Sequence, residues 1–431
     1  MDDKNLNTEA GKFSLLKRFW CMLLLLGPGF FCIGYTIGTG SVTSMAKAGS
    51  QHGMQLLWVL ALSCLFAWVL MEAYGRFAIV TGGTTIHSVK TKLRFGKIFA
   101  VVLLIGVVVG QWTCLSGLVG LSAHAVYEGI RLFIPALHEE NYWAILGIAS
   151  MIMIVMYALL LVGRYSFFEK ILVFFVSILA LSFLISMFIV LPSPKEIASG
   201  MIPSIPKVEG GRLLVAALVG TTMAAPTFVV RPLLMKGKRW TRVDHKKQSR
   251  DSFIAAILMF LISGSIMVTS TTTLFHQGQS IEKVLDMIYI LEPFAGRFAV
   301  ALFLVGTLSA GLSSVFPILM VAPLLIADYR KGELDTGSTV FKILAAIACL
   351  IGLMVPVIGA NPIVAQVATQ ISQVFVLPLV IIAILFLINR KTLMGEFRAG
   401  ILLNLGMGTA LLFSFFISYT AVLAVIEFFG L

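Results

Sequence analysis

The stretch Gly34-Tyr35-Thr36-Ile37-Gly38-Thr39-Gly40-Ser41 interrupts an otherwise apolar run near the start of the chain. The flanking residues 23–31 and 42–48 have the composition of two halves of one membrane-spanning helix. Glycine lowers helix propensity, and lipid offers no partner to a backbone group that has lost its hydrogen bond. Such a break persists at membrane depth only where it is buried in protein or lines a cavity, so the stretch predicts a binding site.

A second interruption lies in an apolar run near the middle of the chain. It has the sequence Gly220-Thr221-Thr222-Met223-Ala224-Ala225-Pro226-Thr227. Two interrupted spans in corresponding halves are typical of transporters whose substrate site lies at the bilayer midplane. The pair of breaks therefore predicts a secondary transporter that works by alternating access.

The composition is that of a polytopic membrane protein, with 59% hydrophobic and 12% charged residues. Its long apolar runs predict eleven spans, at 19–48, 53–79, 97–127, 142–163, 167–192, 211–235, 252–276, 294–327, 340–358, 363–389 and 399–428. With the N-terminus inside, most of the 32 Lys and Arg residues fall in cytoplasmic segments. We therefore expect a cytoplasmic N-terminus and an external C-terminus. The short loops and the lack of a targeting segment favour a bacterial inner membrane.

The spans divide into two five-helix units, 19–192 and 211–389, each of which begins with a broken helix. Because five is odd, the second unit starts on the opposite side of the membrane, as in inverted-repeat transporters. A cytoplasmic tail, 1–18, precedes the first unit. A loop and the eleventh helix, 390–431, follow the second unit.

Several other classes of protein are disfavoured. The net charge of +12 follows from the topology and indicates the lipid bilayer, not a nucleic acid, as partner. The five cysteines form no CxxC pair, and the spans carry no catalytic motif, so neither a cofactor nor an enzyme is expected. A channel would need a continuous polar pore or a ring of charges, and the sparse charge inside the spans argues against one. A sensor that does not transport stays open, and so does the oligomeric state, which is compatible with a monomer.

Several segments carry a resemblance to a known family: Gly27-Pro28-Gly29-Phe30, Val80-Thr81-Gly82-Gly83, Leu274-Phe275-His276 with Ile281-Glu282 and Leu291-Glu292-Pro293, Ala310-Gly311-Leu312-Ser313-Ser314, and Asn389-Arg390-Lys391-Thr392-Leu393-Met394-Gly395-Glu396-Phe397. These segments resemble the Nramp-type (natural resistance-associated macrophage protein) divalent-metal transporters. The resemblance covers nearly the whole chain. It implies an all-α membrane protein with the LeuT-type fold: two inverted five-helix repeats plus an eleventh helix, with helices one and six broken.

The chain departs from this family where the family binds metal. The family's Asp-Pro-Gly-Asn in the first break corresponds here to Gly38, Thr39, Gly40 and Ser41. Its Met-Pro-His in the sixth helix falls on Ala224, Ala225 and Pro226, and its third-helix acids fall on Cys114 and Gly117. Only the glutamine of the tenth helix is retained, as Gln370.

The breaks and the retained glutamine supply the candidate substrate-binding residues: Thr36, Gly38, Thr39, Gly40, Ser41, Thr221, Thr222, Ala224, Thr227 and Gln370. Hydroxyls, carbonyls and one amide can meet a cation through its water shell, and magnesium often keeps several waters. The same groups suit a small amino or organic acid. The resemblance favours a metal ion, Mg-like and without strong proton coupling, although which residues bind it stays unknown. Each hydroxyl taken singly is also suited to bonding its own helix backbone.

Ionisable residues inside the spans are few. Glu72 is the only acid that the predicted spans place well inside a helix, and Arg76 lies four residues on. This spacing predicts an ion pair near the cytoplasmic boundary, with a proton relay as the alternative. Arg231 follows the second break and is a candidate to gate the inner pathway, unless its side chain simply extends to the cytoplasm.

Overall fold

The computed structural model of the chain is helical throughout its long elements. It describes residues 28–134, 141–161, 193–206, 210–283, 286–287, 297–333 and 337–429, with scattered positions between 174 and 188. The predicted tail 1–18, most of the predicted fifth span, Gly27 and Leu291-Glu292-Pro293 lie outside the described residues.

The described helices follow one another with short connections. They are α3 (Pro28–Thr36), α4 (Thr39–His52), α5 (Leu57–Thr81), α6 (Thr85–Lys92), α7 (Gly96–Phe133), α8 (Tyr142–Leu161), α10 (Pro194–Gly200), α11 (Gly211–Thr222), α12 (Ala225–Gly237), α13 (His245–Thr273), α15 (Arg297–Lys331), α16 (Thr339–Gly352), α17 (Met354–Ile358), α18 (Pro362–Asn389), α19 (Lys391–Met394) and α20 (Ile401–Phe429).

Within the described ranges, nine continuous helical stretches are long and apolar enough to cross a membrane. The predicted number is eleven, and two causes explain the difference. A 3₁₀ turn at Gly53–Leu56 joins α4 directly to α5, so the end of the first span and the second span form one stretch. The predicted fifth span lies mostly outside the described residues. Every other predicted span coincides with a helix or a broken pair of helices.

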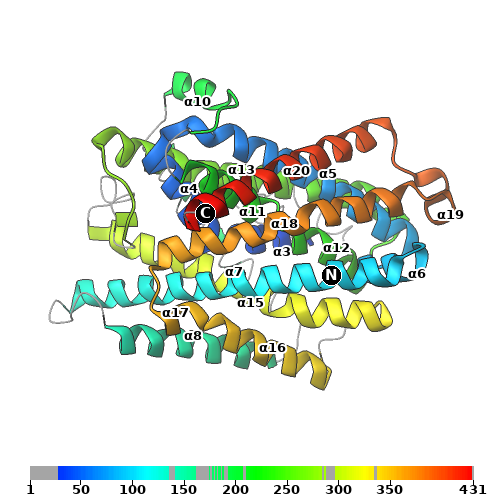
Figure 1. The fold of residues 1–431 in the computed structure, drawn as a ribbon, viewed down its shortest axis with the longest axis horizontal. Coiled ribbons are helices and arrows are strands. Elements are labelled where there is room, and N and C mark those ends of the chain that lie inside the picture. The colour runs from blue at the N-terminus through cyan, green and yellow to red at the C-terminus, as the bar shows by residue number, and fades with distance from the viewer. Residues whose placement is uncertain are drawn as a thin grey trace, which may run out of the picture.

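The long helices α7, α15, α18 and α20 run along the long axis of the molecule, with α8 and α16 on one edge and α10 on the other (Figure 1). The helices α6 and α19 are both at the same end of the molecule, where each contacts α18 (Figure 1). The most extensive helix contact joins α7 to α18. Glycines on α7 permit it: a Cβ at Gly106 would lie 3.2 Å from Val376, and one at Gly110 would lie 3.3 Å from Gln373. Small residues let membrane helices approach closely in this way.

The contact between α11 and α18 yields a first prediction. A Cβ at Gly220 would collide with the backbone carbonyl of Gln370, which cannot move without moving its helix. We expect Gly220→Val to destabilise the protein by about 1–3 kcal/mol, as overpacking does, and to lower the apparent melting temperature in detergent. Gly408→Val is the control, because a Cβ at Gly408 has no atom within 4 Å. Equal melting temperatures for the two variants would contradict the contact.

Candidate functional site

Both predicted breaks are present. Helix α3 ends at Thr36 and α4 begins at Thr39, with Gly38 extended between them (φ −99°, ψ −171°). Helix α11 ends at Thr222 and α12 begins at Ala225. The Thr221 hydroxyl donates to the Thr36 carbonyl oxygen at 3.2 Å, so the two breaks are in direct contact.

The ten predicted binding residues are all buried. Helix α15 approaches the first break, because the Ser314 hydroxyl donates to the Gly34 carbonyl at 2.6 Å. Helix α18 approaches it from another direction, since a Cβ at Gly40 would collide with the side-chain amides of Gln366 and Gln370. The structure thus brings the first break, the second break and Gln370 together.

The candidate hydroxyls fall into two groups. Some have protein partners: Thr36 donates to the Cys32 carbonyl at 2.8 Å, Thr221 donates to Thr36, and Ser41 lies 3.3 Å from the Ser263 hydroxyl. The Thr221 and Ser41 hydroxyls thus join different helices, whereas the Thr36 hydroxyl bonds the backbone of its own helix α3. Others are buried without a hydrogen-bond partner among the described residues, namely Thr39, Thr222 and Thr227. Ala224 lies in the non-helical corner of the second break and contributes no polar side chain.

Three further glutamines on α7 and α18 were not among the predicted binding residues. Gln111 on α7 and Gln366 and Gln373 on α18 are at most 1% exposed, and both amide atoms of each lack a hydrogen-bond partner among the described residues. We call these three residues with Gln370 the glutamine cluster. The spacing 366, 370 and 373 places three glutamines on one face of a helix, and this signal was present in the sequence.

Contacts connect the glutamine cluster to the first break. Gln370 donates its amide to the Cys114 sulfur at 3.1 Å. The Tyr35 side chain lies beside Cys114 and Gln111, without a hydrogen bond of normal geometry. Buried polar groups nearly always have partners, and leaving one unpaired costs about 1–3 kcal/mol. The unpaired amide atoms of this cluster therefore favour an occupant that can both donate and accept hydrogen bonds.

The glutamine cluster and the breaks offer uncharged groups. Among the described residues, no group of three or more His, Cys, Asp or Glu side chains could hold a metal ion. The site as described therefore suits a neutral solute or a cation that retains water, because a dehydrated divalent cation favours at least one carboxylate.

A buried ion pair lies on the predicted cytoplasmic side of the breaks. Arg231 on α12 contacts Asp251 on α13 at 2.6 Å, and their side chains are 0% and 1% exposed. The other Asp251 oxygen accepts from the Gly29 backbone N–H at 3.1 Å, so this carboxylate joins the start of α3 to α12 and α13. The interpretation that Arg231 extends to the cytoplasm is wrong. Its partner precedes the predicted seventh span by one residue, which is why the sequence did not reveal the pair.

The predicted Glu72–Arg76 ion pair forms, with an N–O distance of 3.0 Å. Glu72 is not the only buried acid, however, since Asp251 and Asp328 are also buried. Asp328, near the end of α15, accepts from the backbone N–H of Ile86 at 3.0 Å and so caps the short helix α6. The Asp251 and Asp328 side chains therefore join different helices on the predicted cytoplasmic side of the breaks.

Comparison with known proteins identifies relatives over nearly the whole length. The family model "Natural resistance-associated macrophage protein-like" matches residues 29–424. The divalent metal cation transporter MntH of Acidiphilium cryptum is 25% identical over 383 residues, which are 86% of this chain and 84% of that protein. MntH of Bacillus subtilis is 24% identical over 398 residues, which are 88% and 87% of the two chains.

Solved structures share the fold at low identity. The Eremococcus coleocola manganese transporter superposes with a TM-score of 0.72 at 16% identity, covering 96% of this chain and 89% of its own. MhsT in complex with L-phenylalanine superposes with a TM-score of 0.62 at 12% identity, covering 93% and 98%. The predicted LeuT-type fold, with its first and sixth spans broken, is confirmed.

Proposed function

Since this chain belongs to the natural resistance-associated macrophage protein-like (Nramp) family, we propose that it carries a divalent, Mg-like metal ion that keeps part of its water shell. Membership in this family of membrane metal-ion transporters supports a metal as the substrate. The relatives matched over most of their length are named divalent metal cation transporters. The proposal places the N-terminus in the cytoplasm and the protein in a bacterial inner membrane.

The glutamine cluster is the observation that carries this proposal. Each carboxamide offers one carbonyl acceptor and two N–H donors. A bare cation could satisfy only the oxygen atoms, and water bound directly to a cation donates to the same oxygens. The amide N–H groups need outer water, whose oxygen is free to accept. Magnesium gives up its water reluctantly and usually keeps several water ligands in proteins. A cation surrounded by water matches the unpaired atoms of Gln111, Gln366 and Gln373.

The proposed binding region comprises the glutamine cluster, the backbone at Gly38 and Gly40, and the three unpaired hydroxyls of Thr39, Thr222 and Thr227. We expect weak proton coupling or none. The positions that match the family's third-helix acids hold Cys114 and Gly117, so α7 offers no carboxylate there to take up a proton.

The Arg231–Asp251 and Glu72–Arg76 ion pairs are proposed to form the inner gate. Because Asp251 binds both Arg231 and the start of α3, opening toward the cytoplasm must separate these groups or move them as one body. The Glu72–Arg76 pair lies on the neighbouring helix α5 and is proposed to line the same pathway.

Uptake into liposomes tests the proposal. The purified protein is reconstituted, Mg²⁺ and Mn²⁺ entry are measured, and an interior dye reports pH. We expect saturable Mg²⁺ entry without acidification. Entry should fall to background in Gly38→Trp, since a Cβ at Gly38 already collides with Ser314. It should persist in Gly147→Trp, because Gly147 is exposed and a Cβ there has no atom within 4 Å.

Three results would overturn parts of this proposal. If folded protein admits neither metal, the substrate is not a divalent cation, and uptake of small amino or organic acids becomes the next assay. If the liposome interior acidifies in proportion to the amount of Mg²⁺ that enters, the proposal of weak proton coupling fails. Absence of any saturable flux, with either class of solute, would indicate a sensor.

A further inference from the structure

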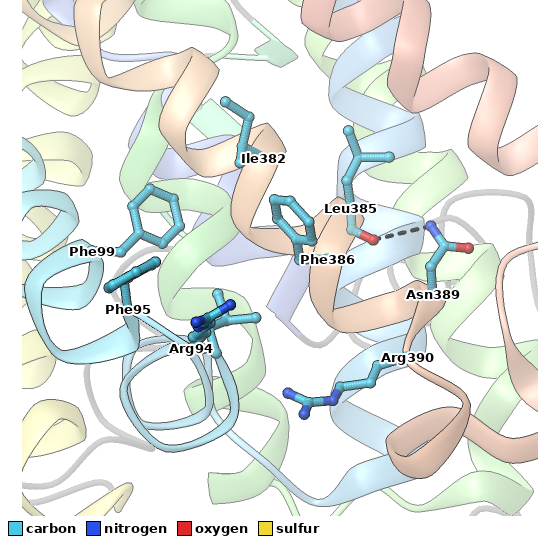
Figure 2. A pocket seen from close by; sticks show the side chains of 9 residues that line it. Arg94, Phe95, Phe99, Ile382, Leu385, Phe386, Asn389 and Arg390 are labelled. Atoms are coloured by element: carbon cyan, nitrogen blue, oxygen red, sulfur yellow. Dashed lines mark hydrogen bonds between the residues drawn. The ribbon is translucent and has the colours of Figure 1, made fainter.

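A pocket of about 710 Å³ lies where the turn between α6 and α7 meets the end of α18. Figure 2 shows Phe95 and Phe99 on one wall, Ile382 and Phe386 on the facing wall, and two arginines, Arg94 and Arg390, below them. The pocket is separate from the breaks and the glutamine cluster, and the proposed transport does not use it.

The walls of this pocket suit an acyl chain. Phe95 is 71% exposed and Phe386 is 61% exposed. Both lie at the boundaries of predicted spans that end on the cytoplasmic side. At the edge of a membrane span, exposed apolar side chains contact the acyl chains of lipid. At the edge of a bilayer the available partner is lipid.

The floor of the pocket suits a phosphate. Neither Arg94 nor Arg390 forms an ion pair with any described residue, and no acid lines the pocket. Helix α7 begins at Gly96, next to Arg94, so its positive dipole end faces the same region. Guanidinium groups bind phosphate oxygens in a bidentate manner.

Arg390 is held in place by its neighbour. The Asn389 side chain donates to the Asn404 side-chain oxygen at 2.6 Å and accepts from the Asn404 amide at 3.0 Å. It also donates to the Leu385 carbonyl at 3.0 Å (Figure 2). The end of α18 is thereby fixed to α20, while the guanidinium of Arg390 stays available for a ligand.

We propose that this pocket binds one anionic phospholipid of the cytoplasmic leaflet. Its phosphate lies between Arg94 and Arg390, and an acyl chain packs against Phe99, Ile382 and Phe386. The lipid joins the beginning of α7 to the end of α18. These two helices carry the glutamine cluster, so the lipid stabilises the packing of the helices that form the proposed substrate site.

Native mass spectrometry of the full chain in detergent, with equal amounts of phosphatidylglycerol and phosphatidylcholine of identical acyl chains, tests this proposal. We expect one phosphatidylglycerol molecule to be retained preferentially. In Arg94→Gln/Arg390→Gln its affinity should fall at least tenfold, because hydrogen bonds to charged groups contribute about 1.5–3 kcal/mol and 1.4 kcal/mol is a tenfold change. Filling the pocket with Ile382→Trp should reduce retention of both lipids.

The matched control is Arg250→Gln/Arg330→Gln, which removes the same charge from exposed positions that do not line the pocket. It should retain phosphatidylglycerol as the parent protein does. The proposal fails if the pocket variant retains this lipid equally well, or if the two lipids bind alike to the unmodified protein. It also fails if glycerol 3-phosphate displaces the lipid, since the arginines would then bind a soluble phosphate without need of the apolar walls.

Discussion

Asp251→Ala is expected to lower the free energy of unfolding by about 3–5 kcal/mol, because it leaves the buried Arg231 guanidinium without its charged partner. The same change frees the Gly29 backbone N–H from its acceptor. In detergent, the variant should lose its monodisperse size-exclusion peak at a lower temperature than the parent. The double variant Arg231→Met/Asp251→Leu should recover most of the loss, since removing both charges leaves neither one unpaired.

An exposed ion pair supplies the comparison. Arg212 and Glu427 lie 3.8 Å apart with side chains 50% and 39% exposed, and such pairs contribute no more than about 1 kcal/mol. Glu427→Ala should therefore hardly change the thermal profile. If Asp251→Ala and Glu427→Ala behave alike, the buried pair does not have the role assigned to it.

The triple substitution of Gln111, Gln366 and Gln373 by leucine is expected to abolish Mg²⁺ uptake without destabilising the protein. Each unpaired buried amide atom costs about 1–3 kcal/mol, and apolar side chains of similar size remove that cost. The melting temperature should stay the same or rise while transport is lost. Transport would then fall while the melting temperature does not, which separates a functional role of the three amides from a structural one.

Single substitutions at the same three positions show whether the amides act together. Each should retain a fraction of the uptake, because water can rearrange around the remaining groups. A marked fall in melting temperature for the triple variant would show that the amides stabilise the fold through partners of their own. Undiminished uptake by a folded triple variant would exclude the glutamine cluster from the site.

The positions of the helices and of both breaks could be predicted from the sequence, because they depend on local properties. Hydropathy places a span, clustered glycines interrupt the first one, and Pro226 marks the restart of the helix after the second break. The Glu72–Arg76 pair was predictable for the same reason, since its partners lie one turn apart on one helix.

The remaining features depend on how helices rotate against one another. Arg231 and Asp251 meet only because α12 and α13 present facing sides, and no local pattern specifies that. Gln111, Gln366 and Gln373 were overlooked for a different reason. Amides carry no charge, so a search for ionisable residues inside the spans passes over them, although their regular spacing on α18 was visible.

The hydrogen bonds at the first break also imply a competition. In this conformation the carbonyls of Gly34 and Thr36 are occupied by the hydroxyls of Ser314 and Thr221. Each carbonyl oxygen has two lone pairs, so a substrate that takes the one used by the hydroxyl competes with α15 or α11 for it. Differential affinity of this kind shifts a conformational equilibrium. Loading the site and loosening these two helices are therefore thermodynamically linked, and any substitution that weakens either hydroxyl contact should raise apparent substrate affinity.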